Sequence, residues 1–360
     1  MSIIKNIYIR KEAANDTSTH EIIARFPNIT PVIIEDESEI ELKFEDSNDY
    51  FKKIKENLII KHNKGHFVAR CPGSSGVTCC NYYVINLVEG CLYDCKYCIL
   101  QSYLNSKGTS VFTNLNKLKE ELEALAYEKR DSFFRIGPGE LADSLVLDHI
   151  TNHSTYLINL FKEFKNGILE LKTKSMNIEN ILKYAPQENV VIAWSVNPQF
   201  IVRRIETGTP SIDKRLAAME RVLERGYKIA IHFDPLFYYP NWQLDYFDLI
   251  DRLMTIIQKY GIERISWISL GTVRFNKKLL SIVKERFATE PLFIEEFFPS
   301  VDNKLRYFRF VREDMYRAIT NRLKEKNKDL PLYFCMEPAF MWENIKLEKK
   351  ELLFAATSLV

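Results

Sequence analysis

The chain has 360 residues, of which 46% are hydrophobic, and its 50 basic and 48 acidic residues leave a net charge of +2. This composition supports a sizeable core in one large α/β domain or in two domains. The nearly balanced charge excludes nucleic-acid binding through net positive charge alone, although a local basic groove is compatible with a net charge close to zero.

The first residues carry no targeting signal that we recognise. Residues 1–16 have no long apolar run and no small-residue cleavage site, so we expect no signal peptide. No stretch approaches the roughly 18 apolar residues of a membrane-spanning helix. We therefore expect a cytoplasmic protein. Its seven cysteines fit a reducing compartment, where clustered thiols bind metals or catalyse more often than they form disulfides.

Residues 1–75 predict an N-terminal α/β extension, because short apolar runs alternate there with charged turns. The stretch from Cys71 to Gly76 predicts a flexible joint. We expect a barrel over residues 76–300 and a C-terminal segment, 301–360, that completes the barrel and its substrate side. We expect a monomer.

From residue 82 onward, predicted strands and helices alternate. Apolar runs predict strands over residues 82–87, 133–137, 168–174, 190–195, 227–233 and 264–270. Helical spacing and start and stop signals predict helices over residues 115–129, 177–185, 210–226 and 249–261. Such alternation implies parallel strands joined by right-handed crossovers. The sequence thus predicts an α/β fold, a partial or full TIM-type (β/α) barrel, with a doubly wound open sheet as the alternative.

Polar residues follow several of the predicted strands. They are Lys174, Ser195, Asn197, His232 and Asp234. In a parallel barrel the carboxyl ends of the strands build the active site. We therefore expect these side chains to meet at one rim.

Cys91, Cys95 and Cys98 follow the first barrel strand with the spacing C-x₃-C-x₂-C. Thiolates suit zinc or iron–sulfur clusters. Structural zinc sites favour two pairs of ligands, whereas three cysteines without a fourth nearby suit a [4Fe–4S] cluster that keeps one iron open.

This loop, C-x₃-C-x-aromatic-C after a first barrel strand, resembles the radical S-adenosylmethionine (SAM) superfamily. The resemblance implies that the open iron binds SAM. One electron, from a donor such as flavodoxin or ferredoxin, then cleaves SAM to methionine and a 5′-deoxyadenosyl radical, which abstracts hydrogen from the substrate. Tyr97 matches the aromatic residue beside the adenine, and Gly137–Glu140 resembles the segment that holds the SAM amino group.

The same resemblance assigns further residues to SAM. Lys174, Ser195 and Asn197 would contact its carboxylate and ribose, and Asp234 joins this cofactor set as a strand-end residue. The alternative for Lys174 is that it has no role in SAM binding and is a solvated cation at a strand end.

A narrower resemblance, over roughly residues 70–310, is to the spore photoproduct lyase family, which repairs a thymine dimer in DNA. The stretches 90–104, 169–182, 194–242 and 304–308 carry it. In that family a cysteine after the second strand returns a hydrogen, and a tyrosine follows the third cluster cysteine. Here Glu140 and Ile99 take those places, leaving Tyr97. We therefore predict action on a nucleic-acid or nucleotide lesion, without the family's usual repair route.

Four cysteines lie outside the loop: Cys71, Cys79, Cys80 and Cys335. They could hold a second metal, act as buried small hydrophobes, or replace the missing thiol donor. Cys335 or Cys80 is the candidate donor, and Cys335 follows a predicted late strand.

Basic and aromatic residues interleave between residues 303 and 317. This pattern suits phosphates and stacked bases, and it equally suits a solvated helix face. The family resemblance points to Arg306 and Tyr307 as substrate-binding residues.

Two other functions stay open at this point. One is radical SAM modification of a peptide or small metabolite, which would need a closed pocket and not a long basic groove. The other is a non-catalytic iron–sulfur or zinc module, which would not need Lys174, Ser195 and Asn197 at strand ends.

Overall fold

The computed structural model describes residues 3–294 and 296–347, and an eight-stranded sheet forms its centre. In order across the sheet, the strands are β4 (Val68–Arg70), β5 (Tyr83–Ile85), β9 (Phe134–Gly137), β10 (Gly167–Thr173), β11 (Val190–Ser195), β13 (Lys228–Leu236), β14 (Ile265–Thr272) and β18 (Leu332–Phe334). Every neighbouring pair from β5 to β18 is parallel, and β4 is antiparallel to β5.

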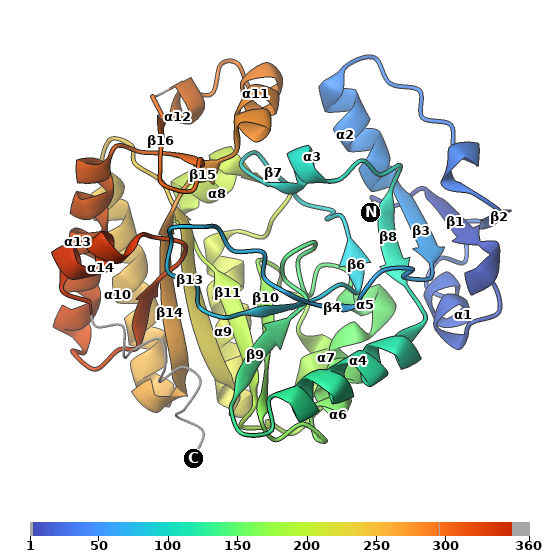
Figure 1. Ribbon diagram of the computed structural model, residues 1–360, viewed down its shortest axis with the longest axis horizontal. Coiled ribbons are helices and arrows are strands. Elements are labelled where there is room, and N and C mark those ends of the chain that lie inside the picture. The colour runs from blue at the N-terminus through green and yellow to red at the C-terminus, as the bar shows by residue number, and fades with distance from the viewer. Residues whose placement is uncertain (1–2, 295, 348–360) are drawn as a thin grey trace.

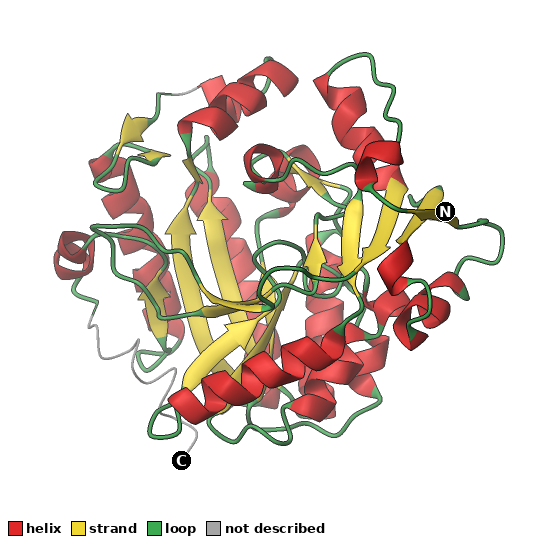
Figure 2. Cartoon of the chain, turned by 45° about the vertical axis from the view of Figure 1, so that its right-hand side comes forward, coloured by secondary structure: helices red, strands yellow, loops and turns green. Residues whose placement is uncertain are grey.

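The strands follow one another across the sheet in chain order, which a doubly wound sheet would reverse at a switch point. Among the described residues, β4 and β18 are the two open edges. The curled sheet with helices on its outer face is seen in Figures 1 and 2. The predicted α/β partial barrel is confirmed.

The helices that accompany these strands have the following bounds: α1 (Thr17–Ile23), α2 (Ser47–Glu56), α3 (Leu100–Tyr103), α4 (Leu115–Glu128), α5 (Asp148–Thr151), α6 (His153–Leu160), α7 (Glu179–Leu182), α8 (Gln199–Ile205), α9 (Ile212–Arg225), α10 (Trp242–Tyr260), α11 (Lys277–Arg286), α12 (Pro291–Ile294), α13 (Arg309–Lys326) and α14 (Ala339–Ile345). None of the described helices is long and apolar enough to cross a membrane.

Local signals explain where the predicted helices begin and end. The Ser211 side chain caps α9 by accepting from the Lys214 backbone N–H, and Gly226 ends it with a φ of 99°. The helix predicted over 177–185 is wrong in length, because only the single turn of α7 forms. The Asn180 side chain there donates to the carbonyl oxygen of Asp148 at 2.9 Å, which ties the segment to α5.

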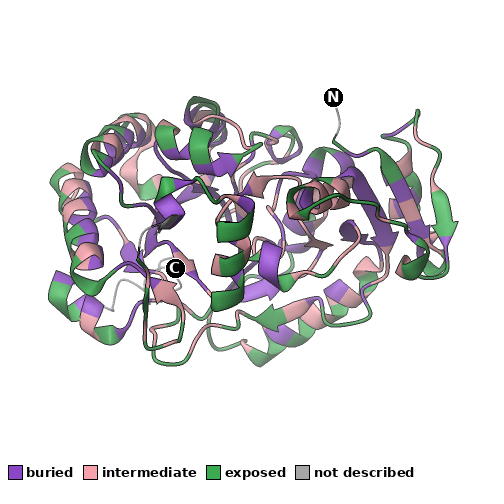
Figure 3. Cartoon of the chain, turned by 90° about the horizontal axis from the view of Figure 1, so that it is seen from above, coloured by how far each residue is buried: buried purple, intermediate pink, exposed green. Residues whose placement is uncertain are grey.

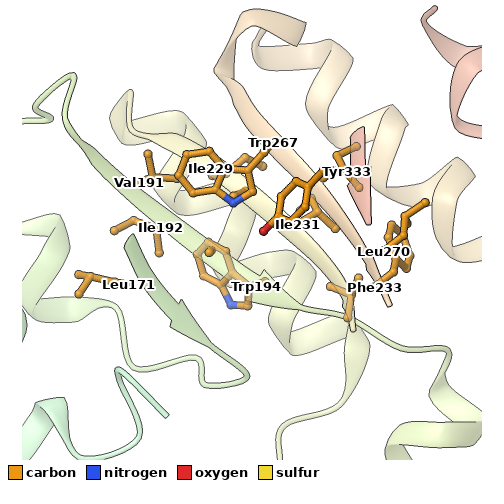
Figure 4. Close-up of a cluster of buried hydrophobic side chains, with 14 of the residues drawn as sticks. Leu171, Val191, Ile192, Trp194, Ile229, Ile231, Phe233, Trp267, Leu270 and Tyr333 are labelled. Carbon is orange, nitrogen blue, oxygen red and sulfur yellow. The ribbon is translucent and has the colours of Figure 1, made fainter. Parts of the chain in front are cut away.

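Apolar side chains from the strands fill the core. All six residues of β11 are buried, so both faces of the strand pack against protein. Figure 4 shows Trp194, Ile231, Trp267 and Tyr333 among the clustered side chains of β11, β13, β14 and β18. Seen from above, exposed residues lie mainly on the outer helices and loops (Figure 3).

A second sheet packs beside the barrel (Figure 1). In order its strands are β2 (Val32–Ile34), β1 (Asn6–Arg10), β3 (Asn57–Lys61), β8 (Thr109–Phe112) and β6 (Val88–Glu89). Two of them, β6 and β8, come from beyond residue 76. The division at residues 75 and 300 stays a prediction, and residues 348–360 lie outside the described residues.

Short strand pairs complete the fold near the barrel mouth. β7 (Asp94–Cys95) pairs with β12 (Glu206–Thr207). The other three form one small sheet: β15 (Arg274–Phe275), β17 (Leu305–Arg306) and β16 (Phe298–Pro299).

Candidate functional site

One pocket at the carboxyl ends of β10 and β11 brings together most of the predicted site residues. They are Cys91, Cys95, Tyr97, Cys98, Glu140, Lys174 and Ser195. The pocket is partly open to solvent, and its cavity volume is about 120 Å³.

The cysteine loop is held by side chains on both sides of it. Lys55 of α2 donates to the carbonyl oxygens of Cys91 at 2.8 Å and Tyr93 at 2.6 Å. Gln101 of α3 donates to the carbonyl oxygen of Cys95 at 3.2 Å. The loop backbone is thus fixed at its beginning and centre, which positions the thiols in advance.

The three thiols of the loop carry their protons when no metal is bound. Burial raises the pKa of Cys91 to about 11 and also raises those of Cys95 and Cys98, so a metal must displace their protons. Within residues 3–294 and 296–347, no three His, Cys, Asp or Glu side chains converge on one metal position.

Tyr97 is fixed by a buried carboxylate. Its hydroxyl donates to Oε1 of Glu206 at 2.7 Å. The ammonium of Lys174 lies 5.7 Å from the centre of the Tyr97 ring, within reach of a cation–π attraction. Glu206 stands opposite Cys95 in the β7–β12 pairing. One carboxylate therefore connects the cysteine loop with the pocket wall.

Glu206 forms a fully buried ion pair with Arg215 of α9, with both side chains 0% exposed and Nη2 2.6 Å from Oε2. Nη1 of Arg215 donates to the carbonyl oxygen of Ser195 at 3.0 Å. Burial alone would raise the pKa of Glu206, but Arg215 and Lys174 lower it. Burial opposes the charge of Lys174, yet Glu206 raises its pKa overall. The pocket wall therefore carries a stable cation.

Two glycines bring the loop after β9 against β10. A Cβ on Gly137 would lie 1.9 Å from the carbonyl oxygen of Glu170, and one on Gly139 would lie 3.1 Å from the Lys172 side chain. No larger residue fits at Gly137 unless β10 moves. Glu140 follows these glycines at the pocket edge.

Asp143 fastens the same loop to the end of β10. It accepts the Thr173 hydroxyl and the Lys174 backbone N–H, both at 2.6 Å. It also accepts the backbone N–H groups of Leu145 and Val146 at 3.0 Å. Asp143 therefore orients the strand end that presents Lys174.

Two predicted cofactor residues lie away from the pocket lining. The amide of Asn197 donates to Glu206 at 3.0 Å, and its oxygen accepts from the Tyr246 hydroxyl at 2.7 Å. Asp234 is paired with Arg274 at 2.9 Å. Both hold neighbouring side chains, and a direct contact of either with a cofactor stays a prediction.

The predicted substrate residues are buried on the C-terminal side of the barrel. The Arg306 guanidinium is bound to Asp302 and to the carbonyl oxygen of Met336. Tyr307 is 3% exposed and stacks on Phe297 with ring centres 5.3 Å apart. Neither lines the pocket, and their substrate role stays a prediction.

Cys335 lies beside the pair formed by Arg274 and Asp234. Nη2 of Arg274 donates to its sulfur at 3.5 Å. Burial and the charge of Asp234 raise the pKa of Cys335 well above its usual range, so it carries its proton.

Sequence reasoning missed Glu206, Arg215 and Asp143. One signal was available for Arg215, because it lies between Ile212 and Met219 on the apolar face of α9. A charged residue on a buried helix face requires a buried partner. The sequence offers no sign that Glu206 is that partner.

A partial barrel of parallel strands whose first strand leads into a three-cysteine loop is the architecture of the radical SAM superfamily. The family model for spore photoproduct lyase matches residues 5–335. The chain therefore belongs to the spore photoproduct lyase family, as its motifs predicted.

Curated relatives share limited identity with the chain. It is 26% identical over 215 residues to spore photoproduct lyase of Geobacillus sp. (strain Y412MC61) and 23% identical over 215 residues to that of Bacillus subtilis (strain 168). Each match covers 59% of this chain and 63% of the relative. The aligned part thus spans less than two thirds of these relatives.

Solved structures share the fold over nearly the whole described chain. A cysteine-to-alanine mutant of spore photoproduct lyase with dinucleoside spore photoproduct has a TM-score of 0.83 at 20% identity and covers 92% of this chain and 99% of that one. A double mutant with bound AdoMet and dinucleoside spore photoproduct has a TM-score of 0.80 at 20% identity and covers 92% and 98%. At this identity the likeness shows the fold alone.

Proposed function

We propose that this chain is a radical SAM enzyme that acts on a nucleic-acid or nucleotide lesion. The observation that carries the proposal is the pocket in which three thiols of one loop lie with Tyr97, Lys174 and Glu140. Family membership supports it, since a solved relative holds both AdoMet and a dinucleoside lesion.

Cys91, Cys95 and Cys98 would hold a [4Fe–4S] cluster, with an electron carrier such as flavodoxin or ferredoxin as donor. When bound, cluster and SAM supply a 5′-deoxyadenosyl radical for hydrogen abstraction. The loop positions the thiols through Lys55 and Gln101.

The pocket walls offer complementary groups for SAM. The Lys174 cation would pair with its carboxylate, and Glu140 would accept from its amino group in a charge-assisted bond. The Tyr97 ring, held by Glu206, would lie by the adenine. Ser195 is the last residue of β11, the strand next to β10, which Lys174 follows. Ser195 lines the same pocket and would contact the ribose.

Hydrogen return must differ from the family's usual route. The resemblance places Glu140 where a donor cysteine is expected and Ile99 where a relay tyrosine is expected. A carboxylic O–H bond is too strong to quench a carbon radical as a thiol does. Another thiol must serve, and the sequence offers Cys335 or Cys80 as the donor.

The test is anaerobic reconstitution with iron and sulfide, followed by SAM and dithionite. The expected result is a broad charge-transfer absorption and formation of 5′-deoxyadenosine. Oligonucleotides that carry defined photolesions then identify the substrate by product and deuterium content. A reconstituted protein that binds iron but never cleaves SAM would refute the function.

A further inference from the structure

We propose that Cys80 donates the hydrogen atom to the substrate radical and that its neighbour Cys79 captures the resulting thiyl radical as a disulfide. The proposal rests on the proposed function and names the donor within it. We call these two residues the Cys79–Cys80 dithiol.

The two thiols are in contact although they are adjacent in sequence. In an extended strand, neighbouring side chains point to opposite faces. Here the chain turns at Asn81, whose φ is 54°, and the Asn81 N–H donates to the sulfur of Cys79 at 3.4 Å. The Cys80 thiol forms a hydrogen bond with the same sulfur.

The two sulfurs have different protonation. The hydrogen bond from Cys80 lowers the pKa of exposed Cys79 to about 6, so Cys79 is a thiolate at neutral pH. That hydrogen bond and burial raise the pKa of Cys80 well above its usual range. A hydrogen-atom donor must keep its S–H bond, and a radical-capturing partner must be a thiolate. The dithiol provides one of each.

Cys80 is partly buried and packs against the main hydrophobic core of the barrel. The charge of Arg135 on β9 lowers the pKa of Cys80 and that of Glu170 on β10 raises it, and Cys80 in turn raises the pKa of Tyr333 on β18. The pKa of Cys71 is raised both by Cys80 and by Glu140, a residue that lines the pocket.

The surroundings of Cys80 contain an unsatisfied polar group. Among the described residues, the buried hydroxyl of Tyr82 has no hydrogen-bond partner. Tyr82 is 7% exposed, and the Arg135 guanidinium lies 5.2 Å from its ring. An unpaired buried hydroxyl is unfavourable because it has lost its hydrogen bonds to water. A polar group of a substrate beside Cys80 would satisfy it.

Cys335 is less suited to the role. Its thiol donates to the carboxylate of Asp234, and Arg274 donates to its sulfur at 3.5 Å. No hydrogen bond to a second thiol is found for it in the part of the chain that the structure describes. In the described residues, a thiyl radical on Cys335 would therefore have no hydrogen-bonded thiolate beside it.

The proposed step balances. The substrate carbon radical takes hydrogen from Cys80, so a C–H bond forms, the S–H bond breaks and a thiyl radical remains. The thiyl radical bonds to the Cys79 thiolate, and the excess electron passes to a one-electron acceptor of the flavodoxin or ferredoxin class. An external dithiol then reduces the disulfide with two electrons; one of its two protons goes to Cys80 and the other is released, which restores the Cys80 thiol and the Cys79 thiolate.

The chemical test is a single turnover in D₂O with flavodoxin as the one-electron carrier and no thiol reductant, with dinucleotide spore photoproduct as the probe. The wild type should form one Cys79–Cys80 disulfide per deuterated product, read by peptide mass spectrometry. Cys80→Ser keeps the volume and polarity of the side chain. It should still form 5′-deoxyadenosine but lose product deuteration at least tenfold. The Cys79→Ala variant should form one deuterated product per chain, because Cys80 is still present, but it should form no disulfide.

A second test needs no turnover. Phenylarsine oxide, which bridges adjacent thiols, should bind the protein without SAM at one per chain. Cys79→Ala or Cys80→Ser should abolish this binding, and Cys71→Ala should retain it. If the wild type does not bind phenylarsine oxide, the thiols of Cys79 and Cys80 are not in contact and the proposal is overturned.

The outcomes separate the two proposals. 5′-Deoxyadenosine with unchanged deuteration in Cys80→Ser overturns the donor role alone. Loss of deuteration only in Cys335→Ala overturns it in favour of the donor predicted from sequence. Absence of 5′-deoxyadenosine in every variant, the wild type included, overturns the proposed function and the donor role with it.

Discussion

Two clusters of largely buried polar side chains differ in how completely they are paired. The pocket-side network consists of Tyr97, Asn197, Glu206 and Arg215, and the ionised groups of Glu206 and Arg215 are bound to each other and to neighbours. The barrel-side cluster consists of Cys80, Tyr82, Arg135 and Glu170. There, in the described residues, the Tyr82 hydroxyl and Nε of Arg135 have no hydrogen-bond partner.

The two clusters have different roles because their side chains are paired to different extents. A fully satisfied network in a low-dielectric interior is rigid, and it positions the loop that carries the cysteines. Unpaired groups are costly unless a ligand completes them. We infer that the pocket-side network orients the cofactor and that the barrel-side cluster receives the substrate.

The largest effect should follow removal of a cluster thiol. Replacing Cys91, Cys95 or Cys98 with Ala should abolish the charge-transfer absorption and all 5′-deoxyadenosine, because the cluster loses one of its three ligands. Cys71→Ala serves as the matched control and should keep its iron. Full iron content and SAM cleavage in a protein with all three replacements would break the assignment.

The pocket-side network can be tested through stability. Glu206→Gln leaves the buried Arg215 charge without its partner, and breaking a buried pair costs about 3–5 kcal/mol. The measurement is the free energy of unfolding in urea.

The matched control is Glu179→Gln. Glu179 pairs with Arg221 at 2.6 Å, but its side chain is 70% exposed. Exposed pairs contribute about 0–1 kcal/mol. If Glu206→Gln and Glu179→Gln lower the free energy of unfolding equally, the buried pocket-side network stabilises the protein no more than an exposed ion pair does.

The stability of the protein at low pH also depends on His153, which belongs neither to the pocket-side network nor to the barrel-side cluster. Burial lowers the pKa of His153 to about 4, from about 6.5 in the unfolded chain. The unfolded state therefore binds the proton more readily, so stability is complete above about pH 6.5 and falls as the pH approaches 4.

Between pH 7 and 5 the wild type should lose about 2 kcal/mol more stability than His153→Gln. Urea unfolding at several pH values measures the difference. His66→Gln, at a side chain that is 84% exposed, is the control and should follow the wild type. Parallel curves for wild type and His153→Gln would contradict the assignment.

The fold was largely readable from the sequence because its signals are local. Runs such as the one that became β11 are continuous and apolar, and both ends of α9 carry capping residues. The spacing of Cys91, Cys95 and Cys98 is also local. What could not be read was long-range: β8 and β6 leave the barrel segment to join the N-terminal sheet.

The site shows the same limit. Lys174 and Glu140 were found because they follow strands, and strand ends meet at one rim. The same rule also selected Asn197 and Asp234, whose partners turn out to be Glu206 and Arg274. Whether a strand-end side chain faces a pocket or a neighbour depends on residues far away in sequence.

Glu140 gives the smallest predicted effect and lies between the two regions. It lines the pocket, and its charge also raises the pKa of Tyr82 and of Cys71 on the barrel side. If it accepts from the SAM amino group, Glu140→Gln exchanges a charge-assisted bond for a neutral one, which is about half as strong. SAM should then bind about tenfold more weakly, equivalent to about 1.4 kcal/mol, in equilibrium dialysis of the reconstituted protein. Glu128→Gln, on the exposed end of α4, is the control and should leave the affinity unchanged. If the Glu140→Gln variant keeps its SAM affinity while product deuteration falls, Glu140 belongs to the barrel-side cluster. Its role is then toward the substrate and not toward the cofactor.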